Sequence, residues 1–154
     1  MKKKILISVA VLLFFTVWLG IPALNKWRAD RLVDQLCAKD GGIKIYETVT
    51  LPKQRFNQWG QFEVRDEKNV RPEDEHYSVW KITNIEGMHE FSGTGQMTIY
   101  QSHFRFYRVS DKKLLGESIS YSRRGGDPIG PWHSSSHSCR RAASTESLIF
   151  KPAT

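Results

Sequence analysis

An uncharged run close to the N-terminus constrains this chain more than any other feature. The 20 residues from Ile5 to Leu24 contain no Asp, Glu, Lys or Arg. As an α-helix this run would be about 30 Å long, which matches the hydrocarbon core of a bilayer. A basic start before an apolar run is also typical of cleaved signal peptides, but this run is longer than their usual core, and no clean pair of small residues follows it. We therefore expect an uncleaved signal anchor, with cleavage as the alternative.

The chain has a net charge of +7, and a strongly basic chain suggests nucleic-acid binding. The meaning of this charge depends on where in the sequence the basic residues lie. Residues 1–31 have a net charge of +5, and the remaining 123 residues together have +2. Most of the excess therefore flanks the apolar run, where it would meet anionic lipid headgroups. This distribution predicts a lipid bilayer as the partner of residues 5–24 and argues against nucleic acid as a partner.

The basic residues around the run also set its expected orientation. Residues 1–4 are a short basic start, which favours a cytoplasmic N-terminus. Lys26, Arg28 and Arg31 follow the run, so the asymmetry is small. We expect residues 5–24 to cross the membrane once and the C-terminal domain to lie outside the cytoplasm.

A juxtamembrane helix is expected over residues 25–41. Five residues recur at i, i+3, i+4, i+7 and i+8, which is one stripe of a helix; they are Ala29, Leu32, Val33, Leu36 and Cys37. The pair Gly41-Gly42 is a typical helix stop. The stripe favours packing of this helix on the domain, with an oligomerisation seam as the alternative.

The remaining chain is expected to form a small domain over residues 42–139, mostly antiparallel β, so that the fold class is α+β with an N-terminal helix. A strand is expected from Ile43 to Leu51, another from Tyr77 to Thr83, and a hairpin over roughly 103–122 with its turn at residues 110–113. Residues 140–154 are expected to be a loose tail or a short edge strand.

The two cysteines, Cys37 and Cys139, lie near opposite ends of the exported region. Two cysteines in a small exported domain most often pair. We therefore expect a disulfide that ties the juxtamembrane helix to the end of the domain. The alternative is two unpaired buried thiols.

The segment 121–139 is the densest in candidate site residues. Its Gly and Pro content predicts a loop, and long ordered loops are often functional. Arg123 and Arg124 beside two glycines could bind an anion through guanidinium groups and backbone amides, with His133 and His137 as further ligand-binding candidates.

The same segment suggests two other chemistries. His133, His137 and Cys139 could hold a metal, but Cys139 is expected in the disulfide and a carboxylate ligand would have to come from far away. A serine nucleophile among residues 134–136 lacks the elbow motif and a triad. The sequence therefore predicts no catalytic residue, no metal and no cofactor, and leaves open whether the protein is an enzyme.

Two segments of the domain carry a resemblance. The stretch CAKDGGIKIYETVTLP (37–52) and the stretch YSRRGGDPIGPWHSSSHSC (121–139) resemble a group of small, uncharacterised proteobacterial envelope proteins. The resemblance covers residues 37–139 and implies a bacterial envelope setting, but it transfers no activity.

Together these observations predict a single-pass protein of the bacterial inner membrane with its C-terminal domain in the periplasm. They favour a non-enzymatic binding module with an envelope protein as its partner. The alternative is a small anion-binding or hydrolytic domain that uses the 121–139 segment.

Overall fold

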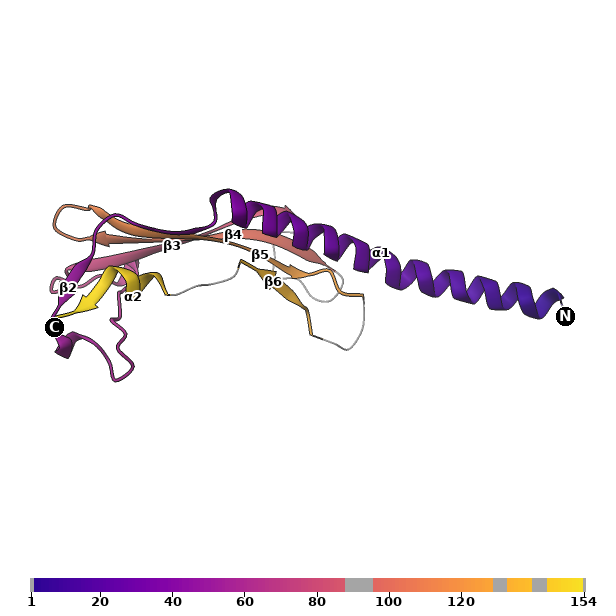
Figure 1. Cartoon of the computed structure of the whole chain (residues 1–154), viewed down its shortest axis with the longest axis horizontal. Coiled ribbons are helices and arrows are strands. Elements are labelled where there is room, and N and C mark those ends of the chain that lie inside the picture. The colour runs from indigo at the N-terminus through magenta and orange to yellow at the C-terminus, as the bar shows by residue number, and fades with distance from the viewer. Residues whose placement is uncertain (1, 88–95, 129–132, 140–143, 154) are drawn as a thin grey trace.

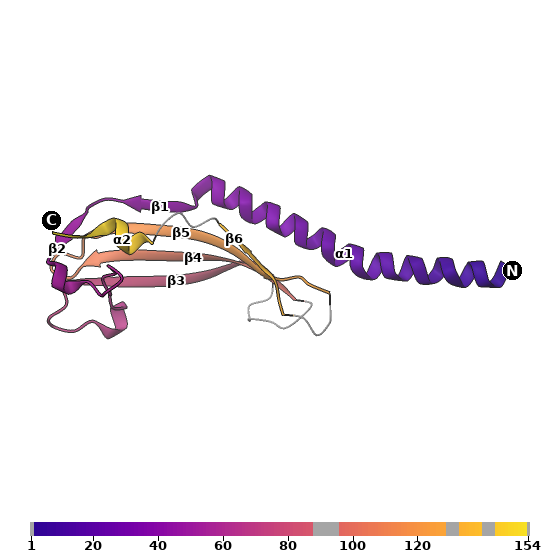
Figure 2. The same ribbon diagram turned by 60° about the horizontal axis from the view of Figure 1, so that its bottom comes forward.

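The computed structural model describes residues 2–87, 96–128, 133–139 and 144–153. Its first element is a single long helix, α1 (Lys2–Asp40). In the views of Figures 1 and 2 the N-terminal half of α1 extends away from the β domain, and the C-terminal half lies along it. The apolar run and the expected juxtamembrane helix are therefore one continuous element.

The helix α1 combines the two properties that the sequence suggests. It is the one helix in the described part of the chain that is long and apolar enough to cross a membrane, and none of its most apolar window is buried. It ends at Asp40, directly before Gly41-Gly42, and Gly42 has a φ of 129° that favours glycine. The expected helix stop is confirmed.

Five strands form the main sheet: β1 (Gly42–Ile45), β3 (His76–Gly87), β4 (Met97–Arg108), β5 (Leu114–Gly125) and β6 (Ser136–Ser138). The order β1-β5-β4-β3 is visible in Figure 2, and every one of these pairs is antiparallel. The outer edge of β5 is shared, because β1 pairs with its first half and β6 with its second half. The predicted hairpin around residues 110–113 is confirmed as β4–β5.

Three expected strands differ in extent. The strand predicted from Tyr77 to Thr83 is longer at both ends, because β3 runs from His76 to Gly87. The strand predicted from Ile43 to Leu51 is two short strands, because the chain leaves the main sheet after Ile45 and forms β2 (Val49–Leu51) in a separate two-stranded sheet. The returning strand of the hairpin continues to Gly125, three residues beyond its predicted end. Arg123 and Arg124 therefore lie on a strand and not in the predicted loop.

The C-terminal segment is more ordered than a loose tail. After the short helix α2 (Thr145–Ile149), strand β7 (Phe150–Pro152) pairs in parallel with β2. Ile149 and Phe150 are fully buried in a core cluster with Leu51, Phe106 and Leu115. The expected short strand is present, but its apolar residues complete the core.

The two faces of the sheet are covered by different elements. Figure 1 shows α1 on one side of the sheet and α2 on the other. On the α1 side, Ala29 and Val33 of the predicted stripe pack against Ile99 and Tyr121. The stripe therefore docks the helix on its own domain.

Two short 3-10 helices, η1 (Lys53–Arg55) and η2 (Glu67–Asn69), lie in the long connection between β2 and β3.

Candidate functional site

Arg123, the first residue of the predicted anion site, is buried between helix and sheet. Only 1% of its side chain is exposed, which is rare for an arginine. Its Nε donates a hydrogen bond to Asp30 of α1 at 2.5 Å, and its Nη1 donates to the carbonyl oxygen of Gly125 and to the Ser135 hydroxyl. The guanidinium is thus occupied by partners within the chain.

The two glycine amides that the anion hypothesis invoked are also occupied. The amide of Gly125 donates to the Ser135 carbonyl, and the amide of Gly126 donates to the Gln96 carbonyl, both at 2.9 Å. Gly125 has a φ of 82°, and a Cβ there would lie 1.9 Å from the Gln96 carbonyl oxygen. These glycines therefore allow two backbone segments to approach each other closely.

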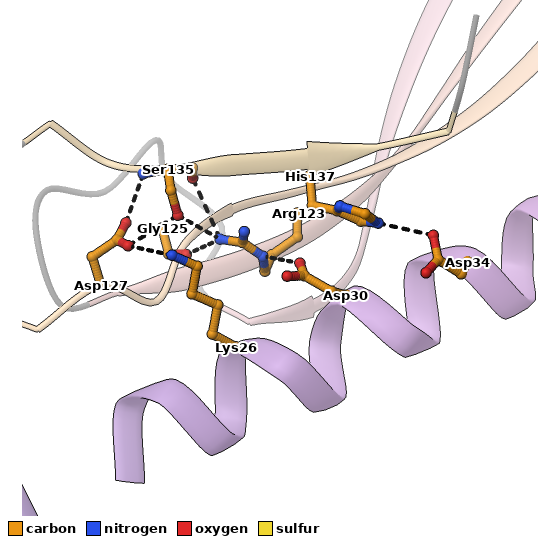
Figure 3. Close-up of polar contacts among 8 residues, drawn as sticks. All are labelled: Lys26, Asp30, Asp34, Arg123, Gly125, Asp127, Ser135 and His137. Atoms are coloured by element: carbon orange, nitrogen blue, oxygen red, sulfur yellow. Dashed lines mark hydrogen bonds and ion pairs between the residues drawn. The ribbon is translucent and has the colours of Figure 1, made fainter. Parts of the chain in front are cut away.

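Asp127 continues the same polar cluster toward the N-terminal end of α1, where it meets Lys26, as Figure 3 shows. Its carboxyl accepts hydrogen bonds from the Lys26 ammonium at 2.7 Å and from the Ser135 amide at 2.6 Å. Burial by itself raises the pKa of Asp127, but the hydrogen bonds from Lys26 and Ser135 outweigh it and lower the pKa to about 2. The carboxylate is therefore a strong anchor for α1 near neutral pH.

This lowered pKa predicts a component of acid sensitivity. The contribution of Asp127 is complete above its ordinary pKa of 3.8 and is lost as the pH falls toward about 2, because the unfolded chain binds the proton more readily. We expect a loss of about 1–2 kcal/mol over that window.

The measurement is urea unfolding of the full-length protein in nonionic detergent at about pH 5 and about pH 2.5. Other carboxyls also titrate there, so the comparison is with Asp127→Asn. We expect the variant to be less stable at the higher pH and to lose less on acidification. Equal losses in both proteins would contradict this role of Asp127.

His137 completes a row of three contacts between α1 and the sheet. Its Nε2 lies 2.8 Å from the carboxylate of Asp34. Lys26, Asp30 and Asp34 are spaced by four residues, so they line one stripe of the helix, and their partners are Asp127, Arg123 and His137 (Figure 3). We call these six residues the helix clamp.

The four predicted ligand-binding residues do not converge on one point. Arg123 and His137 face α1, whereas the neighbouring Arg124 points to the other face of the sheet because side chains alternate along a strand. His133 is exposed. Arg123 and His137 thus have structural contacts that the sequence alone does not suggest.

The predicted disulfide between Cys37 and Cys139 is present, with a Cα–Cα distance of 5.7 Å. It joins α1 to the residue after β6, beside the point where β1 and β6 meet the edge of β5. Cys139 is therefore not a free metal ligand. Within the described residues, no three His, Cys, Asp or Glu side chains are grouped closely enough to hold a metal ion.

A groove that the sequence did not predict lies on the α2 side of the sheet. Its volume is about 850 Å³. The floor comes from β4 and β5, one wall from α2, and the other end reaches Ile43, the end of α1 and the disulfide. The described lining residues include no Lys or Arg, and most are apolar or carry a hydroxyl; among them are Phe104, Phe106, Ser118, Ser120, Leu148 and the carboxyls Asp34 and Glu146.

The groove could not be found in the sequence because its lining comes from five separate elements, α1, β1, β4, β5 and α2, together with Cys139. The only local signal is the alternation of Ser102, Phe104 and Phe106 with residues of the opposite face. That pattern predicts a strand with one distinct face, but it does not say what covers that face.

Comparisons with known proteins identify no relative. No family model matches the chain, no curated protein matches it, and no solved structure matches its fold.

Proposed function

We propose that this protein is a single-pass protein of the bacterial inner membrane whose periplasmic domain is a non-enzymatic binding module. The apolar helix, its basic start and a disulfide that needs an oxidising compartment support this setting. The groove beside α2 supports the binding role, because it is a large concave surface that is mostly apolar.

The chemistry of the groove favours one kind of occupant. Its charged described lining residues are Asp34 and Glu146, so an anionic ligand would be repelled. Burial raises the pKa of Glu146, and Glu63 nearby raises it further, which is consistent with an apolar surrounding. We infer that the occupant is an extended, largely apolar segment of an envelope protein, neutral or basic in charge.

The helix clamp gives this groove a fixed place relative to the membrane. Asp34 and Ala38 line the groove and lie on the same helix as the anchor. Asp34 lies ten positions after Leu24 on the helix, which is a rise of about 15 Å. A partner segment would thus be held about 15–20 Å above the end of the apolar run, which suits a partner that is itself close to the membrane.

The test is site-specific photo-crosslinking in the source cells. A photoreactive residue replaces Leu148, which is 38% exposed at the rim of the groove, and in a control it replaces the exposed Ser110 in the hairpin turn. We expect a discrete crosslinked protein from position 148 only. The same experiment with Ser118→Trp, which fills the groove, should remove it.

Two outcomes would contradict the proposal. One is the same product from both positions, which would indicate random collisions. The other is a product at position 148 that persists when Ser118→Trp fills the groove.

A further inference from the structure

The sheet has an uncovered region on the α1 side, opposite the groove. Figure 1 shows that the C-terminal half of α1 lies along one end of the sheet. The helix stops before the other end, where the turn between β4 and β5 lies. Asp40, the last residue of α1, accepts a hydrogen bond from Tyr121 at 2.9 Å and marks this boundary. We call the region beyond it the open face; its side chains include Lys44, Lys81, His103, Arg105 and Glu117.

The strand register places these five side chains together. Arg105 and His103 lie on the same face as Ile99, which packs under α1, because their positions differ by even numbers. Arg105 lies directly across from Glu117 on β5, and His103 lies across from Lys81 on β3. Lys44 of β1 lies on the other side of Glu117. The open face therefore presents basic side chains from three strands, β1, β3 and β4, around Glu117 of β5.

Glu117, the natural partner of Arg105, is bound elsewhere. One of its oxygens accepts a hydrogen bond from the Tyr46 hydroxyl at 2.8 Å, and the other lies 2.7 Å from Nε2 of His103. The hydrogen bond from Tyr46 is the main reason that the pKa of Glu117 lies below its ordinary value. Both oxygens of the carboxylate are thus engaged away from the guanidinium.

Arg105 is left with no ionic or hydrogen-bonding partner among the described residues. Its Nε is buried and has no acceptor, and its guanidinium lies 6.0 Å from the centre of the Tyr107 ring. A buried polar group without a partner is unfavourable unless something else supplies the acceptor. Lys81, which lies across from His103 on the neighbouring strand, is exposed and has no ion pair in the described part of the chain.

We propose that Arg105, together with His103 and Lys81, forms a binding site for an oxyanion, that is, the carboxylate or phosphate group of a small anionic ligand. The planar guanidinium offers two parallel N–H groups, which match the spacing of two oxygens on such a group. Tyr46 is a positioning residue, because it keeps Glu117 from closing on Arg105. The site lies on the opposite face from the groove and does not depend on the proposed partner.

The experiment titrates the full-length protein in nonionic detergent micelles with citrate and, separately, with inorganic phosphate. Ionic strength is held constant with chloride. The Arg105 Nε–H resonance and the His103 ring resonances are followed by NMR. We expect saturable shifts with a midpoint on the order of 1–10 mM for at least one of the two anions. Saturation by citrate alone assigns a carboxylate, and saturation by phosphate alone assigns a phosphate.

Three variants separate the site from general charge attraction. Arg105→Lys keeps the positive charge but loses the two parallel N–H groups of the guanidinium. We expect the affinity, measured from the shifts of the His103 ring resonances, to fall about tenfold or more. Lys81→Gln should weaken it about threefold, whereas Lys53→Gln, a matched loss of charge in η1, should not change it.

The sharpest variant is Tyr46→Phe, which removes one exposed hydroxyl and leaves Arg105 in place. It frees an oxygen of Glu117 for the guanidinium, and we expect binding to weaken several-fold without loss of the fold. Shifts that do not saturate, that chloride reproduces, or that Lys53→Gln changes as much as Lys81→Gln does would overturn the proposal. So would binding that neither Arg105→Lys nor Tyr46→Phe weakens.

Discussion

Replacing Asp30 with alanine is expected to lower the free energy of unfolding by about 3–5 kcal/mol, although Asp30 lies on the surface of a helix. Its partner Arg123 has 1% of its side chain exposed, so water cannot replace the lost carboxylate. Hydrogen bonds to the Gly125 carbonyl and to Ser135 remain, but they do not neutralise the charge. A buried and uncompensated guanidinium is one of the most unfavourable groups that a fold can contain.

Asp34 provides a matched control one helical turn away. It is also an aspartate of α1 with a basic partner residue on the sheet, but its side chain is 64% exposed and that of His137 is 37% exposed. We expect Asp34→Ala to change the free energy of unfolding by less than about 1 kcal/mol, because exposed ion pairs contribute little. The difference between the two variants therefore measures burial and not the presence of an ion pair.

A double variant tests the explanation itself. Asp30→Leu with Arg123→Met replaces the buried pair by apolar side chains, and such replacements are often neutral or stabilising. We expect it to be more stable than Asp30→Ala. All variants are unfolded with urea as full-length protein in detergent micelles and followed by near-ultraviolet circular dichroism. Equal losses for Asp30→Ala and Asp34→Ala, or a double variant as unstable as Asp30→Ala, would contradict this account of the helix clamp.

The sequence predicted the parts of this fold that depend on local spacing. The apolar run, the stripe on α1 and the β4–β5 hairpin each appear as a periodic pattern within a short stretch. The disulfide was predictable because only two cysteines are present. In each case one rule of geometry or counting was sufficient.

The rest depends on contacts between distant segments, which no local pattern reveals. Arg123 looked like an anion ligand because its sequence neighbours are glycines, yet its partner Asp30 lies 93 residues earlier. The apolar residues Ile149 and Phe150 were visible but too few to predict burial, because β7 pairs with β2 about 100 residues earlier. The groove likewise depends on distant segments, because α1 and α2 border a floor made by β4 and β5. The open face depends on the pairing of β1 with β5, which are about 75 residues apart.

Loss of the disulfide is expected to be the other large effect. Cys37→Ala should lower the free energy of unfolding by about 3–5 kcal/mol, because the bridge closes a loop of 102 residues and restricts the unfolded chain. The bridge also holds Cys139 against the edge of β5, where its amide donates to the Tyr121 carbonyl at 3.1 Å. We therefore expect β6 and its side of the helix clamp to loosen as well.

The control for this variant is its partner. Cys37→Ala, Cys139→Ala and the double variant should be destabilised by nearly equal amounts, because all three remove the same bond. A reductant should destabilise the wild type by a similar amount and leave the double variant unchanged. Clearly additive effects of the two single variants would mean that packing of the two side chains, and not the bridge, accounts for the loss.

The same bond reports on the compartment in living cells. If the domain lies in the periplasm, a thiol reagent added during lysis should modify neither cysteine until the protein is reduced, and then modify both. A variant with Leu12→Arg and Leu13→Arg is the control, because two charges in the apolar run oppose membrane insertion. Its thiols should react without reduction. Free thiols in the wild type as well would place the domain in a reducing compartment, and the proposed topology would then be wrong even if the disulfide forms in the purified protein.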